Sequence, residues 1–142
     1  DPKARRDFWE QIHRLSAEGL TFLITTHYMD EAERCDRLAY LSYGELLTHG
    51  TVSEVIAQAG LTTWSVSGPD LFSLADEIRG RPGVAQALAF GSTLHVSGTD
   101  PIQLAETIAP YRTPEHPWSE VPSGLEDVFI HLMGHSTDNF QP

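Results

Sequence analysis

The sequence predicts an α/β segment over residues 1–60, followed by an α+β domain over residues 61–134. A short run rich in apolar and β-branched residues, 20–26, follows a helical pattern and is typical of a strand buried on both faces, as in a parallel sheet. Gly60 separates the two halves, and strict alternation of side chains begins at Thr62, which predicts a half-buried strand. The length of 142 residues fits one domain or two small ones.

The first predicted element is an amphipathic helix. Asp1 suits an N-cap, and Pro2 suits the first helical position. Apolar residues then recur on one face at positions i, i+4 and i+7, namely Phe8, Ile12 and Leu15. Gly19 can end this helix before the predicted strand.

Local signals define the rest of the first half. Acidic residues in the first turn favour a short helix after the strand, and Tyr43-Gly44 marks the turn of a hairpin. Thr51 with Glu54 matches a capping box. The expected elements are a helix at 30–37, strands at 38–42 and 45–48, and a helix at 51–59.

The second half is predicted to have the order β-α-β-β-α-β, which is that of a split β-α-β, ferredoxin-like sandwich. Asp70 and the pair Asp100-Pro101 are start signals for its two helices. The proline-rich stretch 110–122 leaves room for an edge strand near 118–121.

A final amphipathic helix is expected to follow this domain's strands. Ser123 and Glu126 have the spacing of a second capping box, and Gly134 can end the helix. Residues 135–142 are expected to form a flexible tail.

Composition excludes several classes of function. The net charge is −11, and lysine and arginine form no stripe that could neutralise phosphates, which argues against DNA or RNA as a partner. A single cysteine, Cys35, excludes an intrachain disulfide and suits an inert buried thiol. No apolar run approaches the roughly 18 residues of a membrane span.

His27 is the residue that the sequence singles out. It stands at the C-terminal end of the predicted strand 20–26, and ligands of open α/β sheets bind beyond that end of the strands. A histidine there can donate a hydrogen bond to a phosphate oxygen; alternatively, it only satisfies a helix terminus. His27, Asp30 and Glu31 lack the further ligands of a metal centre, so no metal site is predicted.

The residues around His27 also match a known pattern. His27 is followed after three residues by Glu31-Ala32 and after four more by Arg37, and a hairpin then carries Gly44 and Gly50 at its turn and end. This region resembles the switch loop of ABC transporter ATPases, and in detail it is most similar to the ATPase subunits of ABC-2 type exporters. The stretch 124–129 resembles the Leu-Glu-Asp-Val-Phe ending that is common in such subunits.

The resemblance implies definite roles. His27 matches the switch histidine, which contacts the γ-phosphate of ATP, and Asp1 matches the D-loop aspartate of the dimer interface. Residues 1–60 would be the C-terminal portion of an ABC nucleotide-binding domain, and residues 61–134 an accessory domain. ATP and Mg²⁺ are the implied cofactors of the full-length parent. Implied partners are the N-terminal part of the ATPase domain, a second ATPase subunit, and a transmembrane permease. The permease would hold the cytoplasmic subunit at the inner face of the cell membrane.

The sequence also departs from that family. It contains no G-x-x-x-x-G-K-[ST] loop, no Leu-Ser-Gly-Gly-Gln signature and no Walker B acid. The chain is therefore interpreted as a C-terminal portion that begins at the D-loop and is inactive alone. The predicted strand 20–26 would present an open edge, which we expect dimerisation or domain swapping to cover.

A non-enzymatic module is the alternative hypothesis. Ferredoxin-like sandwiches serve as dimerisation or small-ligand-sensing domains, and residues 61–134 could do the same. No residue there points to a ligand; the outward Thr93, His95 and Ser97 are ordinary for a strand face. The helix that carries Phe129 could instead brace a dimer of ATPase subunits.

Overall fold

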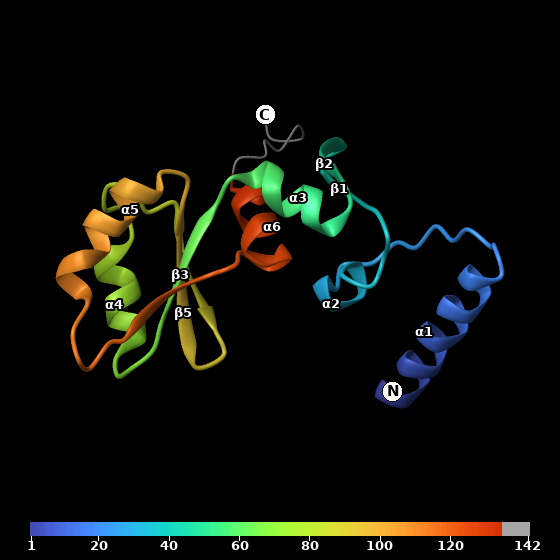
Figure 1. Cartoon of the computed structure of the whole chain (residues 1–142), viewed down its shortest axis with the longest axis horizontal. Coiled ribbons are helices and arrows are strands. Elements are labelled where there is room, and N and C mark those ends of the chain that lie inside the picture. Colours follow the sequence, from blue (N-terminus) through green and yellow to red (C-terminus); the bar gives the residue numbers. More distant parts are fainter. Residues whose placement is uncertain (135–142) are drawn as a thin grey trace.

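The computed structural model describes residues 1–134, and its first helix, α1 (Pro2–Ala17), begins as predicted. The Asp1 carboxylate accepts a hydrogen bond from Lys3 N at 3.0 Å and so caps the helix. The buried face differs from the predicted one, because Trp9 is 2% exposed whereas Phe8 is 53% exposed. Apolar spacing alone could not decide between these two adjacent aromatic residues. Helix α1 stands apart from the sheets at the end of an extended link (Figure 1).

The strand predicted at residues 20–26 is wrong. These residues form the extended link between α1 and the short helix α2 (Met29–Ala32). Leu20 is 53% exposed and Leu23 is 99% exposed. A strand is stabilised by hydrogen bonds to a neighbouring strand, and no described segment pairs with residues 20–26. A β-favouring composition therefore did not suffice to form a strand here.

The hairpin and the helix after it follow the sequence signals closely. Strands β1 (Leu38–Ser42) and β2 (Glu45–Gly50) pair antiparallel. Helix α3 (Val52–Ala59) begins at a confirmed capping box, in which the Thr51 hydroxyl accepts from Glu54 N at 3.2 Å and the Glu54 carboxylate accepts from Thr51 N at 3.3 Å. Helix α2, by contrast, has only four residues instead of the predicted span 30–37.

A four-stranded antiparallel sheet organises the second half. Its strands lie in the order β4-β5-β3-β6, so that β5 separates β3 from β4. Helices α4 and α5 cover one face of this sheet (Figure 1). The elements are β3 (Thr62–Val66), α4 (Leu71–Ile78), β4 (Gln86–Phe90), β5 (Thr93–Gly98), α5 (Pro101–Ile108), the 3₁₀ turn η1 (Ala109–Tyr111) and β6 (Trp118–Val121).

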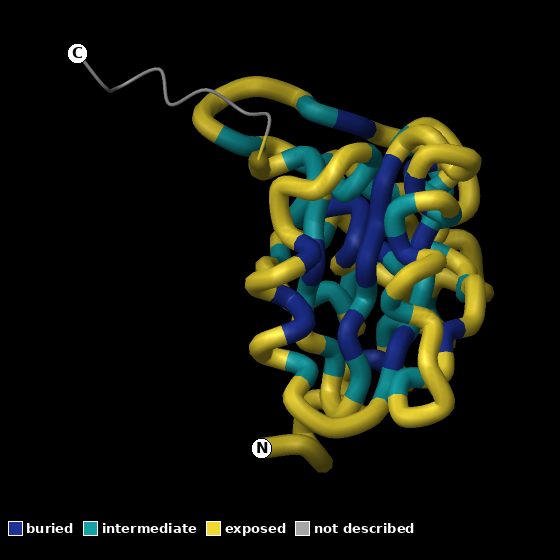
Figure 2. Tube along the Cα trace, turned by 90° about the vertical axis from the view of Figure 1, so that its left-hand side faces the viewer, coloured by how far each residue is buried: buried dark blue, intermediate teal, exposed yellow. Residues whose placement is uncertain are grey.

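The larger apolar core lies between this sheet and its two helices. Val66 and Val96 from the strands and Ile78 from α4 are each 0% exposed, and Leu104 and Ile108 from α5 complete the layer. Figure 2 shows these buried stretches along the inside of the molecule and exposed residues along the outer loops. Burial on one face of each element follows from the alternation and helical spacing in the sequence.

Of the three cap residues predicted in the second half, one caps its helix and two do not. Asp100 caps α5, since its carboxylate accepts from Ile102 N and Gln103 N, each at 3.1 Å. Asp70 has φ 56° and forms no side-chain cap at the start of α4. Ser123 does not cap the last helix, α6 (Leu125–Met133), because its hydroxyl is bound elsewhere.

Helix α6 packs on the first half of the chain as well as on the sheet. A second core joins Val55 of α3 to Leu125, Val128 and Phe129 of α6. Phe129 also stacks on Tyr40 of β1, with ring centroids 4.4 Å apart and an angle of 6° between the rings. Helix α6 therefore belongs to the second half by its place in the sequence but packs on both halves. The division of the chain between residues 60 and 61 stays a prediction.

Candidate functional site

His27 lies in the loop between the extended link and α2. Its side chain is exposed, and its ring packs against Tyr28, with ring centroids 4.2 Å apart and an interplanar angle of 34°. An exposed imidazole offers two nitrogen atoms that can donate or accept a hydrogen bond. The structure thus leaves the His27 side chain exposed, but residues 20–26 before it form no strand, so its contact with a phosphate stays a prediction.

A small polar network holds this loop in place. The Thr26 hydroxyl accepts from Tyr28 N at 3.0 Å and donates to Glu31 Oε2 at 2.8 Å. The other Glu31 oxygen lies 3.4 Å from Arg5 Nε of α1. The Arg5 guanidinium also lies over the Tyr28 ring, 4.8 Å from its centroid. The backbone on both sides of His27 is therefore tied to helix α1.

This network accounts for Glu31, one of the two acidic residues beside His27 that the sequence analysis considered. Asp30 and Glu31 lie in the first turn of α2, and Glu31 pairs with Arg5. Among the described residues, no group of three or more His, Cys, Asp or Glu side chains could hold a metal ion. Arg5 was missed as a positioning residue, since its contacts with Glu31 and Tyr28 join segments separated by the link. Thr26 was missed although its partners are only two and five residues away.

Asp1, the other predicted site residue, has a local role. Its carboxylate caps α1 by accepting from Lys3 N. It is Arg5, one turn further along, that contacts the His27 loop. The assignment of Asp1 to a dimer interface therefore stays a prediction.

Trp9 fixes the second contact between α1 and the loop region. Its ring is buried, and the Arg34 guanidinium lies 5.8 Å from the ring centroid. Cys35, close by, donates its thiol to Glu31 O at 3.7 Å. Burial raises the pKa of the Cys35 thiol, and the nearby Asp36 and Glu31 carboxylates raise it further. A thiol held protonated in this way is a poor nucleophile, as the sequence analysis expects.

A second polar cluster lies on the sheet face opposite α4 and α5, and the sequence analysis missed its importance. Asp127 of α6 is 0% exposed, and its Oδ1 lies 3.1 Å from His95 Nδ1 of β5. Asp127 Oδ2 accepts from Gly124 N at 2.9 Å. The spacing Gly124 to Asp127 was a visible signal, because it matches the capping-box interval one residue after the predicted pair Ser123 and Glu126.

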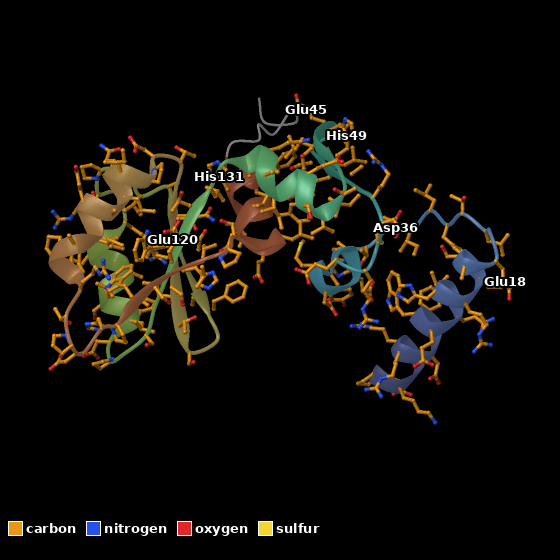
Figure 3. All side chains as sticks on the ribbon, viewed as in Figure 1. Glu18, Asp36, Glu45, His49, Glu120 and His131 are labelled. Carbon is orange, nitrogen blue, oxygen red and sulfur yellow. The ribbon has the colours of Figure 1, made fainter. Side chains whose placement is uncertain are left out.

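Four other acidic residues of the described chain do not gather into a site. The labelled side chains Glu18, Asp36, Glu45 and Glu120 lie in different parts of the molecule (Figure 3). All four are exposed. They are best understood as solvated surface charges.

The ligand-sensing alternative stays a prediction. Shallow depressions follow the two edges of the four-stranded sheet, one beside Arg79 and residues 84–88, the other beside residues 61–63 and 120–123. The Phe129 side chain is 5% exposed and stacked on Tyr40, so it packs within this chain, and the bracing of a dimer by its helix stays a prediction. Within residues 1–134, no helix combines the length and apolar character that crossing a membrane requires.

The sequence was compared with those of known proteins. No family model matches the sequence. The chain is 36% identical over 140 residues to the Nod factor export ATP-binding protein I of Ralstonia nicotianae, an alignment that covers 94% of this chain and 43% of the relative. The protein of the same name from Rhizobium leguminosarum bv. viciae is 36% identical over 140 residues, covering 97% of this chain and 44% of the relative.

A third relative of the same name, from Burkholderia lata, is 37% identical over 148 residues and covers 94% of this chain. The chain spans less than half the length of each of these relatives. These matches confirm the resemblance that the residues around His27 indicate. Over nearly all of its own length, the chain is thus a relative of the ATP-binding subunits of ABC-type export systems.

Proposed function

We propose that this chain serves in the ATP-binding subunit of an ABC-type exporter, which couples ATP hydrolysis to transport, and that His27 contacts the γ-phosphate of ATP. The observation that carries the proposal is the similarity to export ATP-binding proteins over 94% of the chain. The exposed, braced position of His27 agrees with it.

The chemistry asked of His27 is modest and suits its surroundings. An imidazole N–H can donate a hydrogen bond to a phosphate oxygen and lose that contact when the phosphate leaves. The contacts of Thr26, Glu31 and Arg5 fix the backbone beside it, which limits the reorganisation that phosphate binding requires. His27 would therefore report the presence of the γ-phosphate to α1 and α2.

The described residues fit one phosphate contact but not a whole nucleotide site. Lys3, the single lysine of the sequence, lies in the first turn of α1, and no glycine-rich phosphate loop is present in the sequence. ATP and Mg²⁺ would therefore be held mainly by residues of the parent subunit that this chain does not contain. The chain alone is expected to be inactive.

The same proposal includes partners. A second ATPase subunit would complete a dimer, with Asp1 at its interface, and a transmembrane permease would hold the subunit at the inner face of the cell membrane. The relatives' names specify export of Nod factor. A membrane partner would select the transported compound, so we propose no particular transported compound for this protein.

We further infer that residues 61–134 form a ferredoxin-like accessory domain. The order β4-β5-β3-β6 supports this, since β5 lies between the two strands that α4 connects. The predicted tail, residues 135–142, lies outside the described residues.

Replacing His27 in the complete ATP-binding subunit tests the function. His27→Ala is expected to lower the rate of ATP hydrolysis by about 100-fold or more, the effect of removing one donor to a developing charge. Binding of a fluorescent ATP analogue, measured in parallel, should change little. The control is His49→Ala, which removes an exposed histidine of β2. Hydrolysis at the unmodified rate in the His27 variant would refute the proposal.

A further inference from the structure

We propose that helix α6 is a coupling element that transmits displacements between the His27 loop and the four-stranded sheet. The helix has two contact faces, one apolar and one polar, and each joins it to a different half of the chain. The contacts lie within this chain, so the proposal holds whether or not His27 binds a nucleotide.

The apolar face reaches the segment that follows His27. Met29 and Ala32 of α2 pack against the cluster that includes Val128 and Phe129 of α6. Phe129 also stacks on Tyr40, whose strand begins soon after α2. Met29 is only two positions from His27 in the sequence. A movement of this loop therefore reaches α6 through the apolar cluster that both helices share.

The polar face fixes the first turn of α6 to the sheet. Both carboxylate oxygens of Asp127 lie near His95 Nδ1 of β5, at 3.1 and 3.3 Å. Gln86 of β4 donates its side-chain amide to Asp127 O at 2.8 Å. The His95 ring is itself held by Phe90, with centroids 4.4 Å apart and an interplanar angle of 2°. Asp127 is thus fixed from two neighbouring strands.

A third set of bonds anchors the chain just before α6. The Ser123 hydroxyl donates to Leu61 O at 3.2 Å and lies 2.8 Å from Thr63 Oγ1. Thr63 Oγ1 lies 2.8 Å from Ser97 Oγ, and both residues are almost fully buried. Buried polar groups that are all partnered favour one geometry, because any shift leaves a donor or acceptor without a partner.

The two faces together make α6 a rigid connection. Sliding the helix along the sheet would break the bonds of Asp127 and Ser123, whereas separating it from α2 would expose the apolar cluster. Both changes cost free energy, so a displaced α2 is expected to carry α6 and the attached strands with it. By reciprocity, loosening α6 on the sheet should also loosen α2.

Hydrogen exchange of the full chain, followed by mass spectrometry, tests this coupling. In His95→Gln, the amides of α2 and β1 are expected to exchange at least severalfold faster relative to those of α4 and α5. None of the contacts described above joins His95 to α2 or β1, so such a change must be transmitted. Using α4 and α5 as the internal reference removes the effect of a general loss of stability.

A matched control uses another histidine of the same half. His116 Nε2 lies 2.6 Å from Pro69 O, at a loop contact away from α6, so His116→Gln should leave exchange in α2 unchanged. Faster exchange that stays confined to the sheet and α6 in His95→Gln would overturn the proposal. So would an equal response of α2 to His116→Gln.

Two further variants keep the test decisive if His95→Gln does not fold. Gln86→Ala removes only the bond to Asp127 O and should give the same pattern with smaller changes. Tyr40→Leu tests the reverse direction by removing the stack on Phe129, and it should speed exchange in β4 and β5. An unchanged sheet in Tyr40→Leu, with a loosened α6, would contradict transmission through this helix.

Discussion

The four-stranded sheet and the segment around His27 differ in where their apolar side chains lie. In the sheet half, Val66, Val96 and Ile78 are each 0% exposed between strands and helices. In the link before His27, Leu23 is 99% exposed and Leu20 is 53% exposed. The two regions belong to one chain and have similar apolar runs, so composition does not explain the contrast.

Partners within the chain explain it. Strand β3 has a hydrogen-bonded neighbour on each side, and its apolar face meets α4 and α5. Residues 20–26 have neither a pairing strand nor a covering helix among the described residues. Apolar side chains contribute to stability only when something buries them. The comparison predicts that substitutions in the two regions differ in their effect on the free energy of unfolding.

The largest expected effect separates Ile78→Ala from Leu23→Ala. Ile78 is fully buried, so its truncation should lower the free energy of unfolding by about 2–5 kcal/mol. Leu23 is almost fully exposed, so its truncation should change that free energy by no more than about 0.5 kcal/mol. Urea unfolding followed by circular dichroism measures both. Equal losses would show that the link is buried in solution.

How far the sequence predicted the fold depends on whether a signal was local. The capping box of Thr51 and Glu54 and the cap at Asp100 involve near neighbours, and the structure confirms them. The strand predicted from Thr62 is present as β3, but Thr63 and Val66 on its two faces are both buried, so it is not the half-buried strand that was expected. The failed strand at 20–26 depended on a partner distant in sequence, which a single segment cannot reveal. The choice of Trp9 over Phe8 likewise depended on what α1 packs against.

The candidate site shows the same limit. His27 could be singled out as a candidate because its neighbours follow a recognisable spacing. Its supporting contacts could not, since Arg5 and Glu31 meet only after α1 folds back towards α2. The His95–Asp127 pair was hidden for a similar reason: each residue is ordinary in its own element, and only their contact makes them informative.

A second prediction concerns the junction between the two regions. Asp127→Ala leaves Gly124 N and His95 Nδ1 without their carboxylate partner, and should lower the free energy of unfolding by about 1.5–3 kcal/mol. Glu126→Ala is the matched control, because the neighbouring Glu126 is exposed. Thermal unfolding of both variants measures the difference. A larger loss in Glu126→Ala would instead favour the capping box that begins at Ser123.

A third prediction uses the exposed link itself. If apolar residues at 20–26 pair with another copy of the chain, Leu23→Glu should weaken self-association by about tenfold or more, the effect of losing one buried leucine. Sedimentation velocity over a range of concentrations measures this. Phe72→Glu, at an 80% exposed position of α4, is the control and should leave association unchanged. A chain that stays monomeric at high concentration would contradict the expected pairing.

The smallest effect is expected at Cys35, which lies just after α2 in the segment around His27. Burial, with Asp36 and Glu31 nearby, raises the pKa of its thiol above the ordinary value of 9.0. A raised pKa in the folded state gives a stabilising contribution that is complete below the pKa of the unfolded chain and is lost as the pH rises through the folded value.

The raised pKa also leaves less of the reactive thiolate at a given pH. Alkylation of Cys35 by iodoacetamide should therefore be slower in the native chain than in urea, and its pH profile should be displaced to higher pH. Because Cys35 is the single cysteine, the label reports this site alone. Faster alkylation of the native chain near neutral pH would show instead that the contacts around α2 leave the thiol open and activated.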